Sequence, residues 1–72
     1  MRVIQVLDAE EQRQAFVRMI VQEDLDLHDV WLEYFAMSGS ASEEEVALYA
    51  VGMVMLPEAQ RDLLALAAQE SA

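Results

Sequence analysis

The sequence predicts an all-α fold, a small bundle of four short helices that follows an extended N-terminal arm. Three observations indicate this fold. Helix-initiating motifs recur along the chain, the apolar residues between them follow helical spacing, and only residues 2–7, RVIQVL, are a strand candidate. A chain of 72 residues makes one domain, so we expect a single helical domain over 1–72 with its arm at 1–7. A strand needs a partner, so the arm either packs irregularly, which we favour, or pairs with its copy in a dimer.

The first helix is expected over about 8–23. It begins at the sequence DAEE, in which Asp8 can accept a hydrogen bond from a free backbone amide. Glu11 lies three residues later and completes a capping box. Phe16 and Ile20 then fall on one face at helical spacing, so this face is expected to enter the core.

The second helix is expected over about 26–38, with Asp24 or Asp26 as its N-terminal cap. Its apolar residues follow i, i+3, i+4, i+7, i+8 spacing: Leu27, Val30, Trp31, Tyr34 and Phe35. Gly39 is the residue expected to adopt the left-handed conformation that ends the helix. This is the clearest amphipathic pattern in the chain.

The third and fourth helices are expected over about 43–55 and 57–69. Ser42 and Glu45 form a second capping box, which starts the third helix after the turn SGSAS. Pro57 suits the first position of the fourth helix, because its missing N–H would have no partner there. The four expected helices show no internal repeat, and the chain is expected to fray at its last residues, ESA.

The expected third helix carries the most unusual segment of the chain. The stretch 46–57, VALYAVGMVMLP, contains no charged residue, although the formal net charge of the protein is −10. A helix that is apolar on every side must be buried on every side. Three neighbouring helices could just cover it, and a second subunit would cover it fully. Gly52 inside that helix is tolerable where another backbone approaches closely.

Composition excludes several classes of protein. The chain has 14 carboxylates against four arginines and no lysine, so it should be repelled by nucleic acid and by anionic membrane surfaces. It has no cysteine, which excludes disulfides and thiolate zinc sites. Hydrophobic residues make up 56% of this short chain, whose isolated core is small, so oligomerisation is the expected means of stabilisation. The N-terminus lacks a signal-peptide pattern and the apolar run 46–56 is too short to span a bilayer, so we expect a cytoplasmic protein.

An acidic cluster surrounds the single histidine, His28. Its members are Glu23, Asp24, Asp26, Asp29 and Glu33. Asp24 and His28 are four residues apart and could share one helix face, so a divalent cation is conceivable there. No other histidine or cysteine can complete a ligand shell, and helix capping with solvation explains the carboxylates more simply, so we predict no metal site.

Catalysis is not expected from this sequence. The serines of the turn lie in a flexible segment, and one histidine cannot be placed beside them from spacing alone. The chain has two glycines and no glycine-rich phosphate loop. We therefore predict no enzyme and no cofactor.

One family resemblance covers more than half of the chain. Residues 27–67 contain a Trp-Leu-x-Tyr-Phe segment, then a glycine turn, then a helix that begins LPEAQRDLLA. This arrangement resembles short all-helical proteins of unknown function from actinobacteria. The resemblance implies a bacterial cytoplasmic protein and brings no activity or catalytic residue with it.

The sequence therefore predicts a small acidic protein–protein interaction module that forms a homodimer. Aromatic residues and methionine are enriched at interfaces, and the apolar candidates are Trp31, Tyr34, Phe35, Tyr49, Met53 and Met55. Within this class, a regulator that binds a basic transcription or DNA-binding protein fits the sign of the charge, with the acidic cluster as its partner surface. The alternative is a small-ligand or divalent-cation-binding protein that uses the carboxylates of 23–33.

Overall fold

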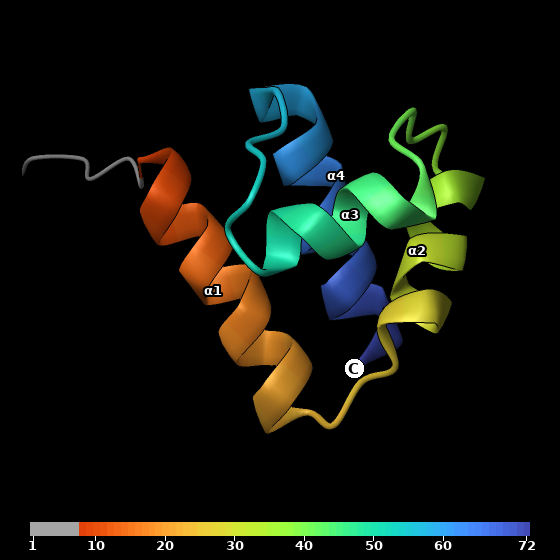
Figure 1. Cartoon of the computed structure of the whole chain (residues 1–72). Helices are drawn as coiled ribbons and strands as arrows, with labels where there is room; N and C mark the ends of the chain where they lie inside the picture. The colour runs from red at the N-terminus through yellow and green to blue at the C-terminus, as the bar shows by residue number, and fades with distance from the viewer. Residues whose placement is uncertain (1–7) are drawn as a thin grey trace, which may run out of the picture.

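The computed structural model describes residues 8–72, and within them it contains four α-helices and no strand (Figure 1). These are α1 (Ala9–Gln22), α2 (Leu27–Ala36), α3 (Glu43–Ala50) and α4 (Glu58–Ser71). The predicted all-α fold of four short helices is confirmed. The predicted arm at 1–7 lies outside the described residues. No helix of the described part is long and apolar enough to cross a membrane.

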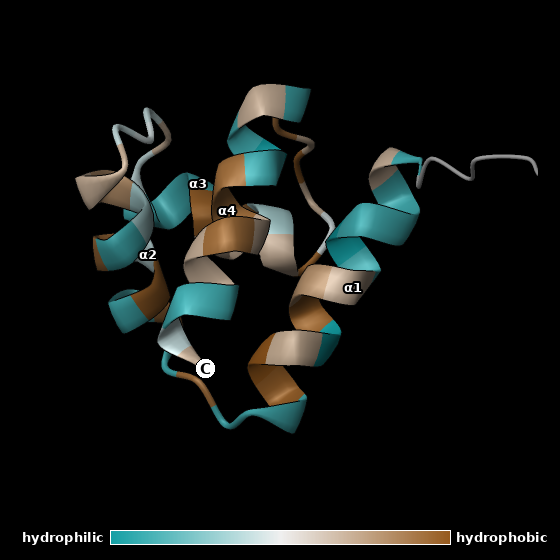
Figure 2. Cartoon of the chain, turned by 180° about the vertical axis from the view of Figure 1, so that it is seen from behind, coloured by the Kyte–Doolittle hydropathy of each residue, from teal (hydrophilic) through white to brown (hydrophobic). Residues whose placement is uncertain are grey.

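Helices α3 and α4 each pack against both α1 and α2. Figure 1 shows α3 crossing in front of α4, and Figure 2 shows α4 in front of α3 from behind. The two inner helices therefore fill the space between α1 and α2 from opposite sides.

The core draws on all four helices. Its largest fully buried side chains are Tyr34, Tyr49, Leu64, Val30 and Val46. Phe16 from α1 packs against Tyr49 with ring centroids 5.8 Å apart. Ala67 and Ala68 of α4 are fully buried, and their small side chains allow the neighbouring helices to approach closely. No polar or charged side chain other than tyrosine is buried in the described residues.

Two helices begin with the capping boxes that the sequence predicts. The Asp8 carboxylate accepts from the Glu11 amide at 2.8 Å, and the Asp8 amide donates to the Glu11 side chain at 3.3 Å. In the same way, the Ser42 hydroxyl accepts from the Glu45 amide at 3.1 Å, and the Ser42 amide donates to the Glu45 carboxylate at 2.9 Å. Both starts are therefore confirmed.

The starts of α2 and α4 show which residue caps each of these helices. Asp26, and not Asp24, caps α2, and its carboxylate accepts from the His28 amide at 2.8 Å. Asp24 instead adopts a left-handed conformation with φ of 52°, at the end of α1. Pro57 is the N-cap of α4, so the helix begins at Glu58, one residue later than predicted.

The end of α2 differs from the prediction. Ser38, and not Gly39, adopts the left-handed conformation, with φ of 73°. Gly39 follows it, and its amide donates to the Tyr34 carbonyl at 3.0 Å. A Cβ atom built on Gly39 would overlap the Tyr34 ring. The glycine is therefore required by close packing, because any side chain would occupy the space of that ring.

The prediction that the third helix runs over 43–55 is wrong, because α3 ends at Ala50. Gly52 adopts the left-handed conformation with φ of 83° and donates its amide to the Tyr49 carbonyl at 3.0 Å. The Met53 amide donates to the Leu48 carbonyl at 2.9 Å. These two bonds form the Schellman motif, which closes a helix and turns the chain away from its axis. The glycine thus ends the helix at the position where we expected it to be tolerated inside.

Candidate functional site

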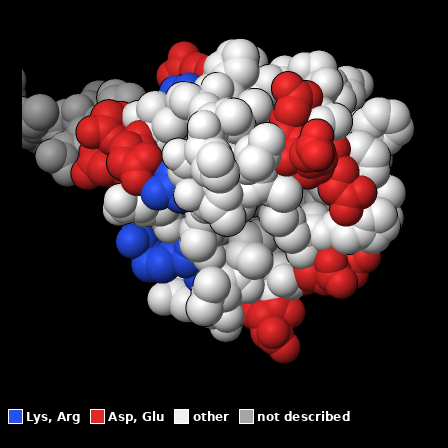
Figure 3. All heavy atoms as spheres, viewed as in Figure 1, with Lys and Arg blue, Asp and Glu red and all other residues white. Residues whose placement is uncertain are grey.

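The five residues after α3 form an exposed apolar segment, which we call the 51–55 segment. Four of the eight large hydrophobic side chains that are exposed in the described residues belong to it: Val51, Met53, Val54 and Met55. Met53 is the most exposed of them, at 73%. Of the two alternatives for covering this stretch, the three neighbouring helices therefore do not cover residues 51–55. Figure 3 shows a broad uncharged surface over α3 and the chain that follows it.

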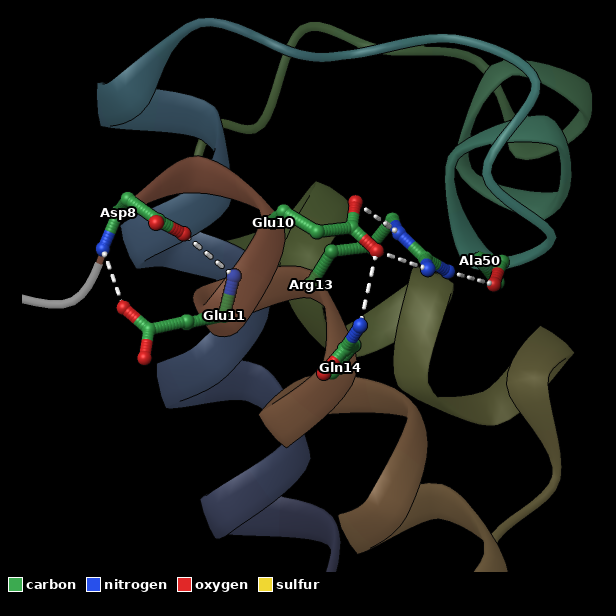
Figure 4. Close-up of polar contacts among 6 residues, drawn as sticks. All are labelled: Asp8, Glu10, Glu11, Arg13, Gln14 and Ala50. Carbon is green, nitrogen blue, oxygen red and sulfur yellow. Dashed lines mark hydrogen bonds and ion pairs between the residues drawn. The ribbon is translucent and has the colours of Figure 1, made fainter.

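Two arginines hold the ends of the 51–55 segment. The Arg13 guanidinium, from α1, donates to the Ala50 carbonyl at 2.8 Å, just before the segment (Figure 4). The Arg61 guanidinium, from α4, donates to the Leu56 carbonyl at 2.7 Å, just after it. Leu56 itself is buried. The segment is therefore fixed at both ends while its apolar side chains face solvent.

Arg13 is itself positioned by an acidic residue one turn earlier in α1. Its Nε and Nη2 atoms donate to the two carboxylate oxygens of Glu10, at 3.0 Å and 2.6 Å (Figure 4). The Gln14 side chain donates to the same carboxylate at 3.1 Å. These bonds favour the ionised carboxylate, so Arg13 first and Gln14 second lower the pKa of Glu10 to about 2.

The Arg13→Gln variant tests this arrangement. We expect the pKa of Glu10 to return from about 2 toward 4.5, because the guanidinium that stabilises the carboxylate is lost. The folded pKa lies below the unfolded one, so the pair stabilises the fold above pH 4.5, and this contribution is lost as the pH falls from 4.5 toward 2. The measurement is an NMR titration of the Glu10 carboxyl carbon.

The matched control for this titration is Arg18→Gln, which removes an arginine of the same helix that has no bond to Glu10. The control should leave the Glu10 titration where it is in the wild type. Equal shifts in both variants would contradict the assignment of the low pKa to the Arg13 contact.

A second exposed surface lies on α2. The Trp31 ring is half-buried and its Nε1 donates to the Ala41 carbonyl at 3.1 Å. It stacks on Phe35, with centroids 5.2 Å apart, and on His28, with centroids 6.3 Å apart. Phe35 is 59% exposed. Trp31 and Phe35 are therefore accessible, as an interface residue must be, but they lie on α2 and not in the 51–55 segment that contains Met53 and Met55.

Two of the six predicted interface residues are in the core. Tyr34 and Tyr49 are almost completely buried, so the prediction that they face a partner is wrong. The Tyr34 hydroxyl accepts from the Ala41 amide at 2.8 Å and donates to the Gln60 side chain. The Tyr49 hydroxyl has no hydrogen-bond partner in the described residues, and burial raises its pKa. Both rings lie on the inward face of their helices, which helical spacing alone did not distinguish from a partner-facing side.

The five carboxylates of the acidic cluster are all exposed and are spread over several elements. Glu23 caps the end of α1, Asp24 lies in the following turn and Asp26 caps α2, whereas Asp29 and Glu33 lie within α2. In residues 8–72, no three His, Cys, Asp or Glu side chains are grouped so that they could hold a metal ion.

His28 is directed to a different carboxylate from the one that spacing suggested. Its Nδ1 atom lies 2.7 Å from the carboxylate of Glu43, at the start of α3, and not beside Asp24. This contact favours the charged imidazolium and raises the pKa of His28. Both side chains are about half exposed, so the pair is an ordinary surface contact between α2 and α3.

Two depressions mark the surface of α1. The larger, of about 430 Å³, runs along one face of the helix and is lined by Arg13, Gln14, Val17, Arg18, Val21 and Gln22. The smaller, of about 210 Å³, lies between α1 and α4 and is lined by Gln12, Ala15, Phe16, Met19, Ala65, Ala68 and Gln69. Arg13 both lines the larger depression and contacts Ala50, so this depression borders the 51–55 segment.

Comparison of the chain with protein-family models, with curated proteins and with solved structures gave no match. The resemblance of residues 27–67 to short actinobacterial helical proteins stays a prediction.

Proposed function

We propose that the protein is a small acidic interaction module that forms a homodimer through the 51–55 segment. The observation that carries this proposal is the exposure of four large apolar side chains in a segment whose two ends are fixed by Arg13 and Arg61. Contiguous exposed apolar surface is uncommon on monomers and typically marks an interaction site. Because the ends of the segment are already fixed, less conformational entropy is lost on binding, and more of the contact energy contributes to the affinity.

The chemistry of the segment suits a protein partner. Methionine side chains are flexible and polarisable, which lets them fill irregular gaps, and methionine is enriched at interfaces. Burying one such side chain completely is worth ~1.5–3 kcal/mol relative to leaving it in water. A chain of 72 residues has a small core of its own, so burial of these side chains against a second copy would stabilise the fold as well.

The regulator hypothesis and the cation-binding alternative rest on a different surface. Both use the carboxylates of 23–33, which lie exposed and spread over α1, the following turn and α2. No contact in the described residues favours either of them over solvation.

The Met55→Glu variant tests the proposal against a matched control, Leu66→Glu. Met55 and Leu66 are both 47% exposed, but Leu66 lies on α4 (residues 58–71), outside the 51–55 segment. We expect Met55→Glu to weaken the dimer by at least tenfold, since a buried charge at an interface costs more than ~1.4 kcal/mol. Leu66→Glu should leave it unchanged. The readout is the concentration dependence of the melting temperature, which rises with concentration only for a dimer.

A third variant, Phe35→Glu, locates the interface. It changes the exposed aromatic surface of α2 and should leave the dimer unchanged. If only Phe35→Glu abolished the concentration dependence, the interface would lie on α2 and the proposed role of the 51–55 segment would be refuted.

A further inference from the structure

The outward face of α3 changes in character along its length. Glu44, Ala47 and Val51 lie at i, i+3 and i+7 and are all exposed, whereas Val46 and Tyr49 are buried on the opposite side. The face is therefore acidic where the helix starts and apolar where it leads into the 51–55 segment.

Glu44 is the one carboxylate at the start of α3 that is not engaged within residues 8–72. Glu43 is paired with His28, and Glu45 accepts the capping bond from Ser42. Glu44 has neither a hydrogen bond nor an ion pair in the described part of the chain. Its charge is available to another molecule.

On α1, Arg18 is an exposed cation. Arg18 lines the depression along α1, beside the apolar Val17 and Val21. Arg13 is engaged with Glu10 and Ala50, whereas Arg18 makes no hydrogen bond or ion pair within residues 8–72. Figure 3 shows uncharged surface between the charged side chains at the left, where blue and red ones lie side by side, and the red ones at the right.

We propose that the second copy docks on this face with Arg18 of each copy opposite Glu44 of the other, on both sides of an apolar centre formed by the 51–55 segment. The inference rests on the proposed homodimer and adds its arrangement. In a two-fold dimer the same patch serves both copies, and the axis lies in the plane of the interface. An axis perpendicular to the line from α1 to the start of α3 brings Arg18 of each copy opposite Glu44 of the other. An axis along that line would place Arg18 opposite Arg18 and Glu44 opposite Glu44, which is unfavourable.

The size of a stable interface supports the use of both edges. Specific interfaces bury ~800 Å² on each partner from ~20–30 residues. The whole chain exposes 4891 Å², so such an interface would cover about a sixth of it. Five residues cannot supply this area. The depression along α1 borders the 51–55 segment through Arg13, which contacts Ala50, and the outward face of α3 adjoins the segment on its other side.

The test uses two charge-reversed variants of the full chain, Arg18→Glu and Glu44→Arg. Each alone should raise the dimer dissociation constant on the order of tenfold, because each dimer then contains two pairs of like charges. The double variant should restore the wild-type constant. An equimolar mixture of the two single variants should form a heterodimer, in which both ion pairs are re-formed. Sedimentation equilibrium gives the constants, and circular dichroism verifies that each variant is folded.

Glu70→Arg is the matched control, since it changes the net charge by the same amount near the end of α4. Less negative copies repel each other less, so general electrostatics predicts tighter dimers for both Glu44→Arg and Glu70→Arg. Only the proposed arrangement predicts weakening for Glu44→Arg. Equal dissociation constants for Glu44→Arg and Glu70→Arg, or no rescue in the double variant, would overturn the proposed arrangement. In that case, a dimer that is still weakened by Met55→Glu would show that the interface itself is correct. A wild-type chain that stays monomeric would overturn both.

Discussion

The variant Gly39→Ala should lose about 3 kcal/mol of unfolding free energy, the largest loss expected from adding one methyl group to this chain. The added Cβ would fall within the Tyr34 ring, which is completely buried and cannot move aside. The backbone cannot retreat easily either, because the Gly39 amide donates to the Tyr34 carbonyl and the Ser40 amide donates to the Gln60 side chain, both at 3.0 Å.

Thermal unfolding measures this effect. For a domain of this size, 1 kcal/mol shifts the melting temperature by ~4–8 °C, so Gly39→Ala should melt more than ~10 °C below the wild type. Gly52→Ala is the matched control, because its Cβ would lie 3.4 Å from the nearest Arg13 atom and meets no overlap. The control should lose only the ~1–2 kcal/mol that a left-handed conformation costs a residue with a side chain. A Gly39→Ala variant that melts no lower than Gly52→Ala would contradict the close packing on Tyr34.

Only Tyr34→Phe, and not Tyr49→Phe, should destabilise the fold, although each variant removes one hydroxyl from a fully buried ring. Removal of the Tyr34 hydroxyl leaves the buried Ala41 amide without an acceptor and takes one of two donors from the Gln60 side chain, which should cost about 2 kcal/mol. The Tyr49 hydroxyl has no partner in the described residues, so Tyr49→Phe removes a buried polar group that nothing compensates. We expect this variant to be as stable as the wild type or up to ~1 kcal/mol more stable.

Urea denaturation at one fixed protein concentration compares these two variants, since a dimer's stability depends on concentration. Each variant is the other's control for the loss of a hydroxyl. Equal losses in both would contradict the assignment of the hydrogen bonds to Tyr34 alone.

Local motifs explain why most of the fold could be predicted from the sequence. The capping boxes at Asp8 and Ser42 need only residues three apart, and both form as expected. Helix ends were harder to predict. At the end of α2, Ser38 and not the neighbouring Gly39 adopts the left-handed conformation, and position 39 is a glycine because the Tyr34 ring leaves no room for a Cβ atom. The end of α3 was missed because an apolar run continues past Gly52 without any polar signal that the helix has stopped.

The candidate surface was only partly predictable. Met53 and Met55 are exposed, but they were expected on an apolar helix and lie instead in the segment after it. Tyr34 and Tyr49 share the interface-like composition of the other candidates, and only the tertiary packing shows that they face inward. The bond from Arg13 to Ala50 joins residues 37 positions apart through a backbone carbonyl, which no residue pattern can reveal.

Sedimentation equilibrium of the wild-type chain, from micromolar to millimolar concentration, tests the association most directly. Self-association through the 51–55 segment predicts an average mass that rises with concentration from 8.1 kDa toward twice that value. A mass that stays at 8.1 kDa over the whole range would show that this exposed apolar segment does not bind a second copy.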